Sequence, residues 1–379
     1  MIYLDNSATT PVDPEVLAAF VKVNENFWGN PNSLHSIGAQ AESLLMQSER
    51  QVLSLLGASH HRVIFTSGAT ESNNLALKGF CNAYGRRGRH IIATPVEHPS
   101  VHEVLENLAA SGFRITFIDA TGSDQEILQE IKEAICEDTI LISMMHVNNE
   151  TGRVFPVYKI GELLRGYPKI KYHVDAVQSL GKLTVDLDRM NVDMLSMSAH
   201  KIHGLKGCGA LIINDNLRLN AEIIGGGQMD GHRSGTVNVP GAVALAKALR
   251  LSLEPLNEHY SRMSEIFDYA LSELTKLEGV VINSSGYIQS PYIINFAAVP
   301  IKGETLVHAL EEHGIYISAK SACSSKSTTA SRILLAMGIC EEVALESVRV
   351  SFSHLNTLDD AKALINALKV VLPELKSRE

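Results

Sequence analysis

The sequence predicts an α/β protein in which a mostly parallel central sheet is flanked by helices, accompanied by a smaller α+β domain. Short β-rich runs alternate with helical stretches between about residues 60 and 215. Most of these runs are continuously apolar, as expected for strands covered on both faces. At 379 residues, the chain is also too long for one small core.

The large domain is predicted from seven runs that have strand character. They are Arg62–Thr66, His90–Thr94, Arg114–Ile118, Thr139–Met144, Ile170–Val174, Met194–Met197 and Gly209–Ile213. Helical patterns lie before or between several of them, at Leu44–Leu56, Glu71–Leu77, Val101–Leu108 and Gln125–Ile135. Ligands of such sheets gather at the carboxyl ends of the strands, so the residues that follow each run are candidates for the functional site.

The pattern changes after the glycine run 225–227. Helices are predicted at Ala242–Glu254, Tyr260–Leu277 and Glu304–His313, and strands at Tyr292–Phe296 and Ser347–Ser353. We therefore expect a large domain over residues 15–250, and a small domain built from residues 1–14 and 251–379.

The composition indicates a soluble globular protein. Hydrophobic residues make up 45% of the chain, and the net charge of −9 gives no support for direct nucleic-acid binding. No signal peptide is visible, and the apolar runs are far shorter than the roughly 20 residues of a membrane span. We therefore expect a cytoplasmic protein that has no membrane partner.

The five cysteines form no C-x-x-C pair, so neither a disulfide framework nor a metal site is predicted. Four of them are expected to be small buried hydrophobic residues. They are Cys81, Cys136, Cys208 and Cys340.

The first strand-end motif is TSGATE (66–71), a turn of small residues that opens a helix. Free backbone N–H groups and the positive end of the helix dipole suit an anion such as phosphate. Thr70 adds a hydroxyl to this turn. The alternative is an ordinary helix cap, which this motif alone does not exclude.

The second motif is HVDAVQ (173–178), in which a strand ends on an aspartate. The Asp175 carboxylate suits a cationic ring nitrogen, and Gln178 lies close enough along the chain to reach the same ligand. Taken alone, Asp175 is better explained as the cap of the next helix.

The third motif is SMSAHKIHG (196–204), which places Lys201 beside Ser198 and His200 at a strand end. Lysine is normally a solvated surface charge. Partial desolvation beside a histidine lowers the pKa of a lysine and makes it a nucleophilic amine that reacts with aldehydes.

The three motifs together predict a site for pyridoxal 5′-phosphate, which needs a phosphate cradle, a carboxylate at the ring nitrogen and a lysine at the aldehyde. His98, after the 90–94 run, is a candidate to stack on the ring and move protons, although a lone histidine is better explained as a hydrogen-bonded core residue. A dinucleotide site is disfavoured, because no G-x-G-x-x-G follows a first strand.

A family resemblance rests on motifs spread over nearly the whole chain. In order they are YLDNSATT (3–10), GNPNSLH (29–35), TSGATESNN (66–74), EH (97–98), HVNNETG (146–152), HVDAVQ (173–178), SAHK (198–201), RSGT (233–236) and SACS (321–324). With these motifs, the chain resembles the cysteine desulfurases of the NifS/IscS-like group. This group is part of the class V aminotransferase family, within the fold-type I pyridoxal-phosphate enzymes.

The resemblance implies a role for each matching residue. Lys201 would bind the cofactor aldehyde, Asp175 the ring nitrogen and Gln178 the ring hydroxyl, while His98 would stack on the ring and exchange protons. The groups that would hold the phosphate are Ala69, Thr70, Ser198, His200 and, from the second subunit of a homodimer, Thr236. Asn149 would lie beside the cofactor and Arg349 would bind the substrate carboxylate.

Cys323 would carry the sulfur as a persulfide. It lies in a polar stretch of small residues, SAKSACSSKSTTAS (318–331), with Lys320 and Lys326 near enough in sequence to favour a thiolate. Lys320 stands where many relatives have glycine.

The resemblance implies that L-cysteine is the substrate and that an acceptor protein takes the sulfur for tRNA thiolation, thiamine or iron–sulfur cluster biosynthesis. About one helix follows Leu358, without the longer tail that some cluster-assembly desulfurases use to bind their scaffold. This difference slightly favours a dedicated acceptor, such as a tRNA-thiolation enzyme. The alternatives are a selenocysteine lyase or another reaction of the same fold, neither of which needs Cys323. A non-enzymatic scaffold is disfavoured, because both Lys201 and Asp175 are present.

Overall fold

The computed structural model describes residues 1–319 and 329–377. The chain divides into two compact units. One contains residues Met1–Thr10, Val147–Phe155 and Pro255–Glu379, and the other contains Pro11–His146 and Pro156–Glu254. We call them the small unit and the large unit.

The large unit is built on a seven-stranded sheet with the order β2-β8-β7-β6-β5-β3-β4. Its strands are β2 (His61–Thr66), β3 (His90–Ala93), β4 (Arg114–Phe117), β5 (Thr139–Met145), β6 (Lys171–Asp175), β7 (Met194–Ser198) and β8 (Gly209–Asn214). Only β8 is antiparallel to its neighbours, so the predicted mostly parallel sheet is confirmed. Each of the seven predicted runs begins and ends within one residue of an observed strand.

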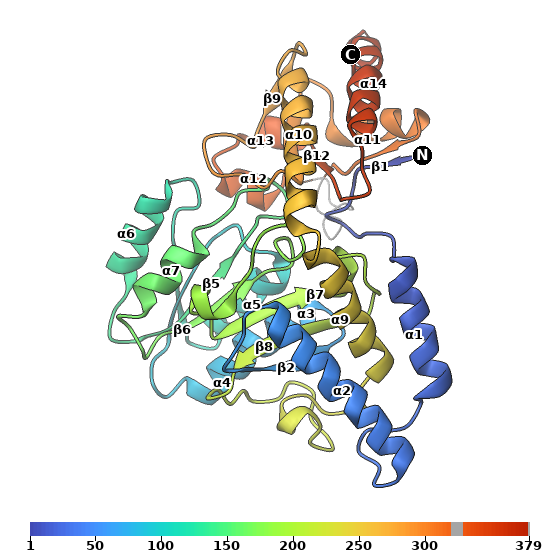
Figure 1. Ribbon diagram of the computed structural model, residues 1–379. Coiled ribbons are helices and arrows are strands. Elements are labelled where there is room, and N and C mark those ends of the chain that lie inside the picture. The colour runs from blue at the N-terminus through green and yellow to red at the C-terminus, as the bar shows by residue number, and fades with distance from the viewer. Residues whose placement is uncertain (320–328, 378–379) are drawn as a thin grey trace. The chain divides into compact units, whose positions relative to one another are not determined.

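Helices cover this sheet (Figure 1). The longer ones are α1 (Pro14–Asn26), α2 (Ser36–Leu55), α5 (Pro99–Ala110), α6 (Asp124–Ala134), α7 (Val157–Leu164) and α9 (Val239–Leu253). Short turns are α8 (Leu187–Met190), η2 (Ala199–Lys201) and η3 (Met229–Gly231). Helix α9 packs against both α1 and α2.

The predicted helix after β2 is interrupted. It runs as α3 (Ala69–Asn74), a π-helical turn η1 (Leu75–Gly79) and α4 (Phe80–Tyr84) without leaving the helical path. Leu75, Leu77 and Phe80 are buried in a core cluster with apolar side chains from the sheet. The start of α3 packs against β7 and β8.

The small unit contains a three-stranded antiparallel sheet with the order β12-β10-β9. Its strands are β9 (Val280–Ile282), β10 (Ile293–Ala298) and β12 (Ser347–Ser351), and a separate pair joins β1 (Ile2–Tyr3) to β11 (Ile315–Tyr316). The helices are α10 (Leu256–Leu274), α11 (Gly303–Glu312), α12 (Arg332–Ala336), α13 (Glu341–Leu345) and α14 (Leu358–Lys376). Within the described residues, no helix is long and apolar enough to cross a membrane.

The expectation that four cysteines are buried is wrong for two of them. Cys81 and Cys208 are buried, and burial raises the pKa of both thiols. Cys136 and Cys340 are exposed, because each lies in a short connection at the surface rather than in a strand or helix interior.

Gly209 occupies a close contact between backbones. A Cβ atom at this position would lie 2.5 Å from Gly68 Cα and 2.8 Å from Met197 O. We predict that Gly209→Ala costs about 2 kcal/mol of stability, because backbone atoms cannot move aside as a flexible side chain does. Thermal unfolding checks this.

Gly166→Ala is the control for this substitution, because the nearest atom to its new Cβ is Leu163 O at an ordinary 3.5 Å. Equal melting temperatures for the two variants would contradict the prediction.

Candidate active site

A buried polar chain leads from the end of β6 to the start of α5. Asp175 accepts hydrogen bonds from Asn73 Nδ2 at 2.9 Å and from Val177 N at 3.0 Å. Asn73 Nδ2 also donates to Ser100 Oγ at 2.9 Å, and Ser100 Oγ lies 2.8 Å from His98 Nδ1. The structure therefore brings Asp175 and His98 into one network through two residues to which the sequence analysis assigned no role.

His98 is positioned by the helix that it caps. Its Nδ1 accepts from Ser100 N at 3.1 Å, at the first turn of α5. Because this nitrogen acts as the acceptor, the proton of the neutral ring is assigned to Nε2.

The start of α3 and the end of β7 lie side by side. Gly68, the N-cap of α3, makes no side-chain capping bond, and a Cβ built on it would lie 3.8 Å from Ser198 Oγ. Ala69 and Thr70 are the first two residues of α3. Ala69, Thr70 and Ser198, which are predicted to bind the phosphate, therefore lie together at the start of α3.

Lys201 and His200 lie in the turn η2, directly after β7. Bonds from Ala199 N to Cys208 O and from Gly204 N to Ala199 O close this turn. Burial, followed by the charges of Lys201 and Lys206, lowers the pKa of His200 to about 4. His200 is therefore a neutral hydrogen-bonding group at neutral pH.

Thr236 lines a cavity of about 260 Å³ together with Ser67 and Gly209 of the same chain. Arg233, in the same RSGT motif, donates from Nε to Glu71 Oε1 at 2.9 Å. Burial raises the pKa of Glu71, but the bonds from Arg233 and Ser67 outweigh this effect and leave the pKa below its usual value. This ion pair holds the RSGT segment at the start of α3.

Gln178 is buried and held by Lys182, a residue that the sequence analysis did not single out. Lys182 Nζ lies 2.9 Å from Gln178 Oε1. An ammonium group can only donate, so the amide oxygen of Gln178 faces Lys182 and its NH₂ group is directed elsewhere.

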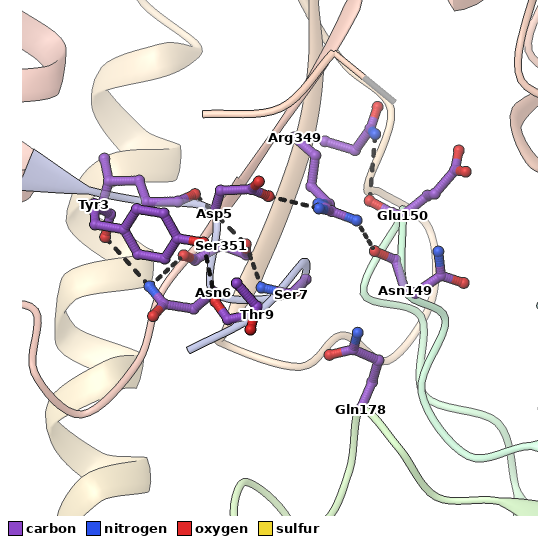
Figure 2. A network of polar contacts seen from close by, with 12 residues as sticks. Tyr3, Asp5, Asn6, Ser7, Thr9, Asn149, Glu150, Gln178, Arg349 and Ser351 are labelled. Carbon is purple, nitrogen blue, oxygen red and sulfur yellow. Dashed lines mark hydrogen bonds and ion pairs between the residues drawn. The ribbon is translucent and has the colours of Figure 1, made fainter. Parts of the chain in front are cut away.

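The small unit holds the two remaining described candidates, Arg349 and Asn149. Arg349 donates from Nη1 to the Asn149 carbonyl oxygen at 2.8 Å and from Nη2 to Asp5 Oδ1 at 2.6 Å. Both contacts are marked in Figure 2. Arg349 is 2% exposed and its Nε has no hydrogen-bond partner among the described residues. Sequence reasoning missed the contact between Asp5 and Arg349, because these residues are 344 positions apart.

Cys323 lies outside the described residues, and two described residues, one before and one after 320–328, contact Arg349 and the neighbour of Asn149. Ser318 pairs with Arg349 through main-chain bonds of 3.1 and 2.6 Å. Ser331 Oγ donates to Glu150 Oε2, next to Asn149.

These residues fit pyridoxal phosphate. The buried Asn73 Oδ1 has no partner within the described chain, the start of α3 offers uncapped N–H groups, and the Asp175 carboxylate retains lone pairs beyond its two bonds. Asp175 would hold the ring nitrogen, Lys201 the aldehyde and the start of α3 the phosphate. No group of three or more described His, Cys, Asp or Glu side chains could hold a metal ion.

Comparison with known proteins identifies relatives over nearly the full chain. The sequence profile of the aminotransferase class-V family matches residues 2–364. A "NifS/IcsS protein homolog" of Lactobacillus delbrueckii subsp. bulgaricus is 42% identical over 97% of this chain and 96% of its own length. "Cysteine desulfurase IscS" of Vibrio cholerae serotype O1 is 38% identical over 99% of this chain and 94% of its own length.

The fold has close structural neighbours as well. A solved structure described as "NIFS-LIKE PROTEIN" superposes with a TM-score of 0.90 at 34% identity, covering 98% of this chain and 99% of the other.

The contribution of Asn73 to cofactor binding can be tested by substitution. Asn73→Ala removes the donor that joins Asp175 to Ser100, and the loss of a buried hydrogen bond to a charged group should weaken pyridoxal-phosphate binding by about tenfold or more. Titration of the apoprotein, followed by cofactor absorbance, measures this affinity.

The matched control for Asn73→Ala is Asn74→Ala. Within the described part of the chain, the side chain of Asn74 bonds only to Thr70 O, one helical turn back. An Asn73→Ala affinity equal to that of Asn74→Ala would refute the role of the network.

Proposed function

The chain belongs to the aminotransferase class-V family, and we propose that it is a cysteine desulfurase that converts L-cysteine to L-alanine and carries the sulfur as a persulfide on Cys323. The observation that carries the proposal is the buried Asn73–Asp175 network at the end of β6, with Lys201 in the turn after the neighbouring strand β7. A non-enzymatic member of the family would have no need of a buried carboxylate at the end of β6 and a lysine in the turn after β7.

Pyridoxal phosphate, when bound, supplies an electron sink for bonds at the substrate's α and β carbons. Asp175 keeps the proton on the ring nitrogen, and Gln178 donates its NH₂ group to the ring hydroxyl. His200, neutral at pH 7, and the start of α3 bind the phosphate. His98 carries protons from Nε2, since its Nδ1 is engaged with Ser100.

Arg349 binds the substrate carboxylate and so orients the sulfur toward Cys323. The Cys323 thiolate attacks this sulfur: an S–S bond forms, the carbon–sulfur bond breaks, and its electron pair takes a proton at the β carbon to give alanine. The described anchors on both sides of 320–328, Ser318 at Arg349 and Ser331 at Glu150, support this role for Cys323.

The persulfide is passed to an acceptor protein for tRNA thiolation, thiamine or iron–sulfur cluster biosynthesis. We further propose a cytoplasmic homodimer in which Thr236 of one subunit reaches the phosphate of the other. The cavity that Thr236 lines beside Ser67 is compatible with such a contribution.

Lys201→Ala is expected to abolish alanine formation and the visible absorbance of the bound cofactor while leaving the melting temperature of the apoprotein unchanged. The described turn η2, which follows β7, contains no second lysine that could replace Lys201. Lys206→Ala is the control, because Lys206 is exposed in the same connection. A Lys201→Ala protein that still forms alanine would exclude Lys201 as the cofactor lysine.

Cys323→Ser is expected to keep cofactor and substrate binding but to lose persulfide formation, because a hydroxyl is a far weaker nucleophile toward sulfur than a thiolate. The measurements are alanine release from cysteine and mass spectrometry for one added sulfur on the protein.

Cys136→Ser is the matched control for Cys323→Ser. The Cys136 thiol is exposed, and a hydrogen bond with Thr139, with help from Arg114, lowers its pKa. Wild-type alanine release from Cys323→Ser would rule out the persulfide mechanism and favour a lyase of the same fold.

A further inference from the structure

Arg349, to which the proposed function assigns the substrate carboxylate, already contacts a carboxylate of its own chain. Its Nη2 lies 2.6 Å from Asp5 Oδ1, and Figure 2 shows the two side chains pointing at each other. Arg349 is 2% exposed and the Asp5 side chain 20%. The pair is therefore shielded from solvent. Two shielded charges act on each other more strongly than two charges at the surface.

Several bonds fix Asp5 in this position. Asp5 forms a parallel bridge with Ser351, which is two residues after Arg349 and on the same face of β12. Ser351 N donates to Leu4 O at 2.7 Å, and Asn6 donates to Ser351 O from both its main chain and its side chain. The contact between Asp5 and Arg349 is thus part of the folded small unit and is not a loose surface ion pair.

We propose that Asp5 sets the affinity of the carboxylate site by neutralising Arg349 before substrate arrives. A substrate carboxylate that binds the same guanidinium is attracted by Arg349 and repelled by Asp5. The product alanine carries the same carboxylate, so this repulsion also promotes its release. This inference rests on the proposed role of Arg349 and adds to it a residue that limits how tightly amino acids bind.

Asp5→Asn tests the proposal, because it removes the charge and retains the shape and one acceptor oxygen. With the holoenzyme, KM for L-cysteine is expected to fall by about tenfold, because one like charge within a few ångströms of the ligand carboxylate is removed from a partly shielded site. The dissociation constant of L-alanine, measured by isothermal titration calorimetry, should fall by a similar factor. A purely structural role for Asp5 predicts the opposite sign, since a misplaced Arg349 would weaken both ligands.

Three further variants make the outcome decisive. Asp359→Asn removes one negative charge from an exposed ion pair on α14 and should leave both constants unchanged. Asp5→Ser removes the same charge with a smaller side chain and replaces Asp5→Asn if that protein does not fold. Arg349→Lys should raise KM, because a lysine lacks the planar two-pronged geometry.

The proposal is overturned if neither neutral Asp5 variant tightens cysteine or alanine while Arg349→Lys weakens them. An Arg349→Lys variant with wild-type KM would instead refute the proposed function of Arg349, whatever Asp5 does.

Discussion

The Asp175 carboxylate is the constraint on which the large unit's site depends. A buried charge is costly unless hydrogen bonds or an opposite charge compensate for it. Here one bond comes from Val177 in its own turn and the other from Asn73, which ties the start of α3 to the end of β6. The second Asn73 bond, to Ser100, adds the first turn of α5 and with it His98. One carboxylate thus fixes the relative positions of the residues that are proposed to bind the phosphate and the ring and to transfer protons.

In the small unit, a buried positive charge is likewise compensated by hydrogen-bond partners. Arg349 is buried on β12, and Asp5 and the Asn149 carbonyl satisfy its two terminal nitrogens. Residues 1–10 and 147–155 come from distant parts of the sequence, yet both pack in this unit. Each of them supplies one of these two partners, which gives a physical reason for their position there.

Sequence patterns predicted the strands of the large sheet well because doubly covered strands are short, apolar and bounded by turns. The same reasoning predicted Asp175, Ser198 and Lys201 as site residues, and the structure places them at or just after the ends of β6 and β7. It did not find Asn73, Lys182 or Asp5. Asn73 and Asp5 act on partners 102 and 344 positions away, and Lys182 resembles any surface lysine until its burial is known. The π-helical turn after α3 has no sequence signature of its own.

Peptide mapping of the holoenzyme after borohydride reduction tests the central claim most directly, because reduction fixes the cofactor covalently on the lysine that binds it. The account predicts a single modified peptide that carries the pyridoxyl group on Lys201. Modification of Lys182 or Lys206 instead, or an unmodified chain from a protein that contains the cofactor, would contradict the placement of the site at the ends of β6 and β7.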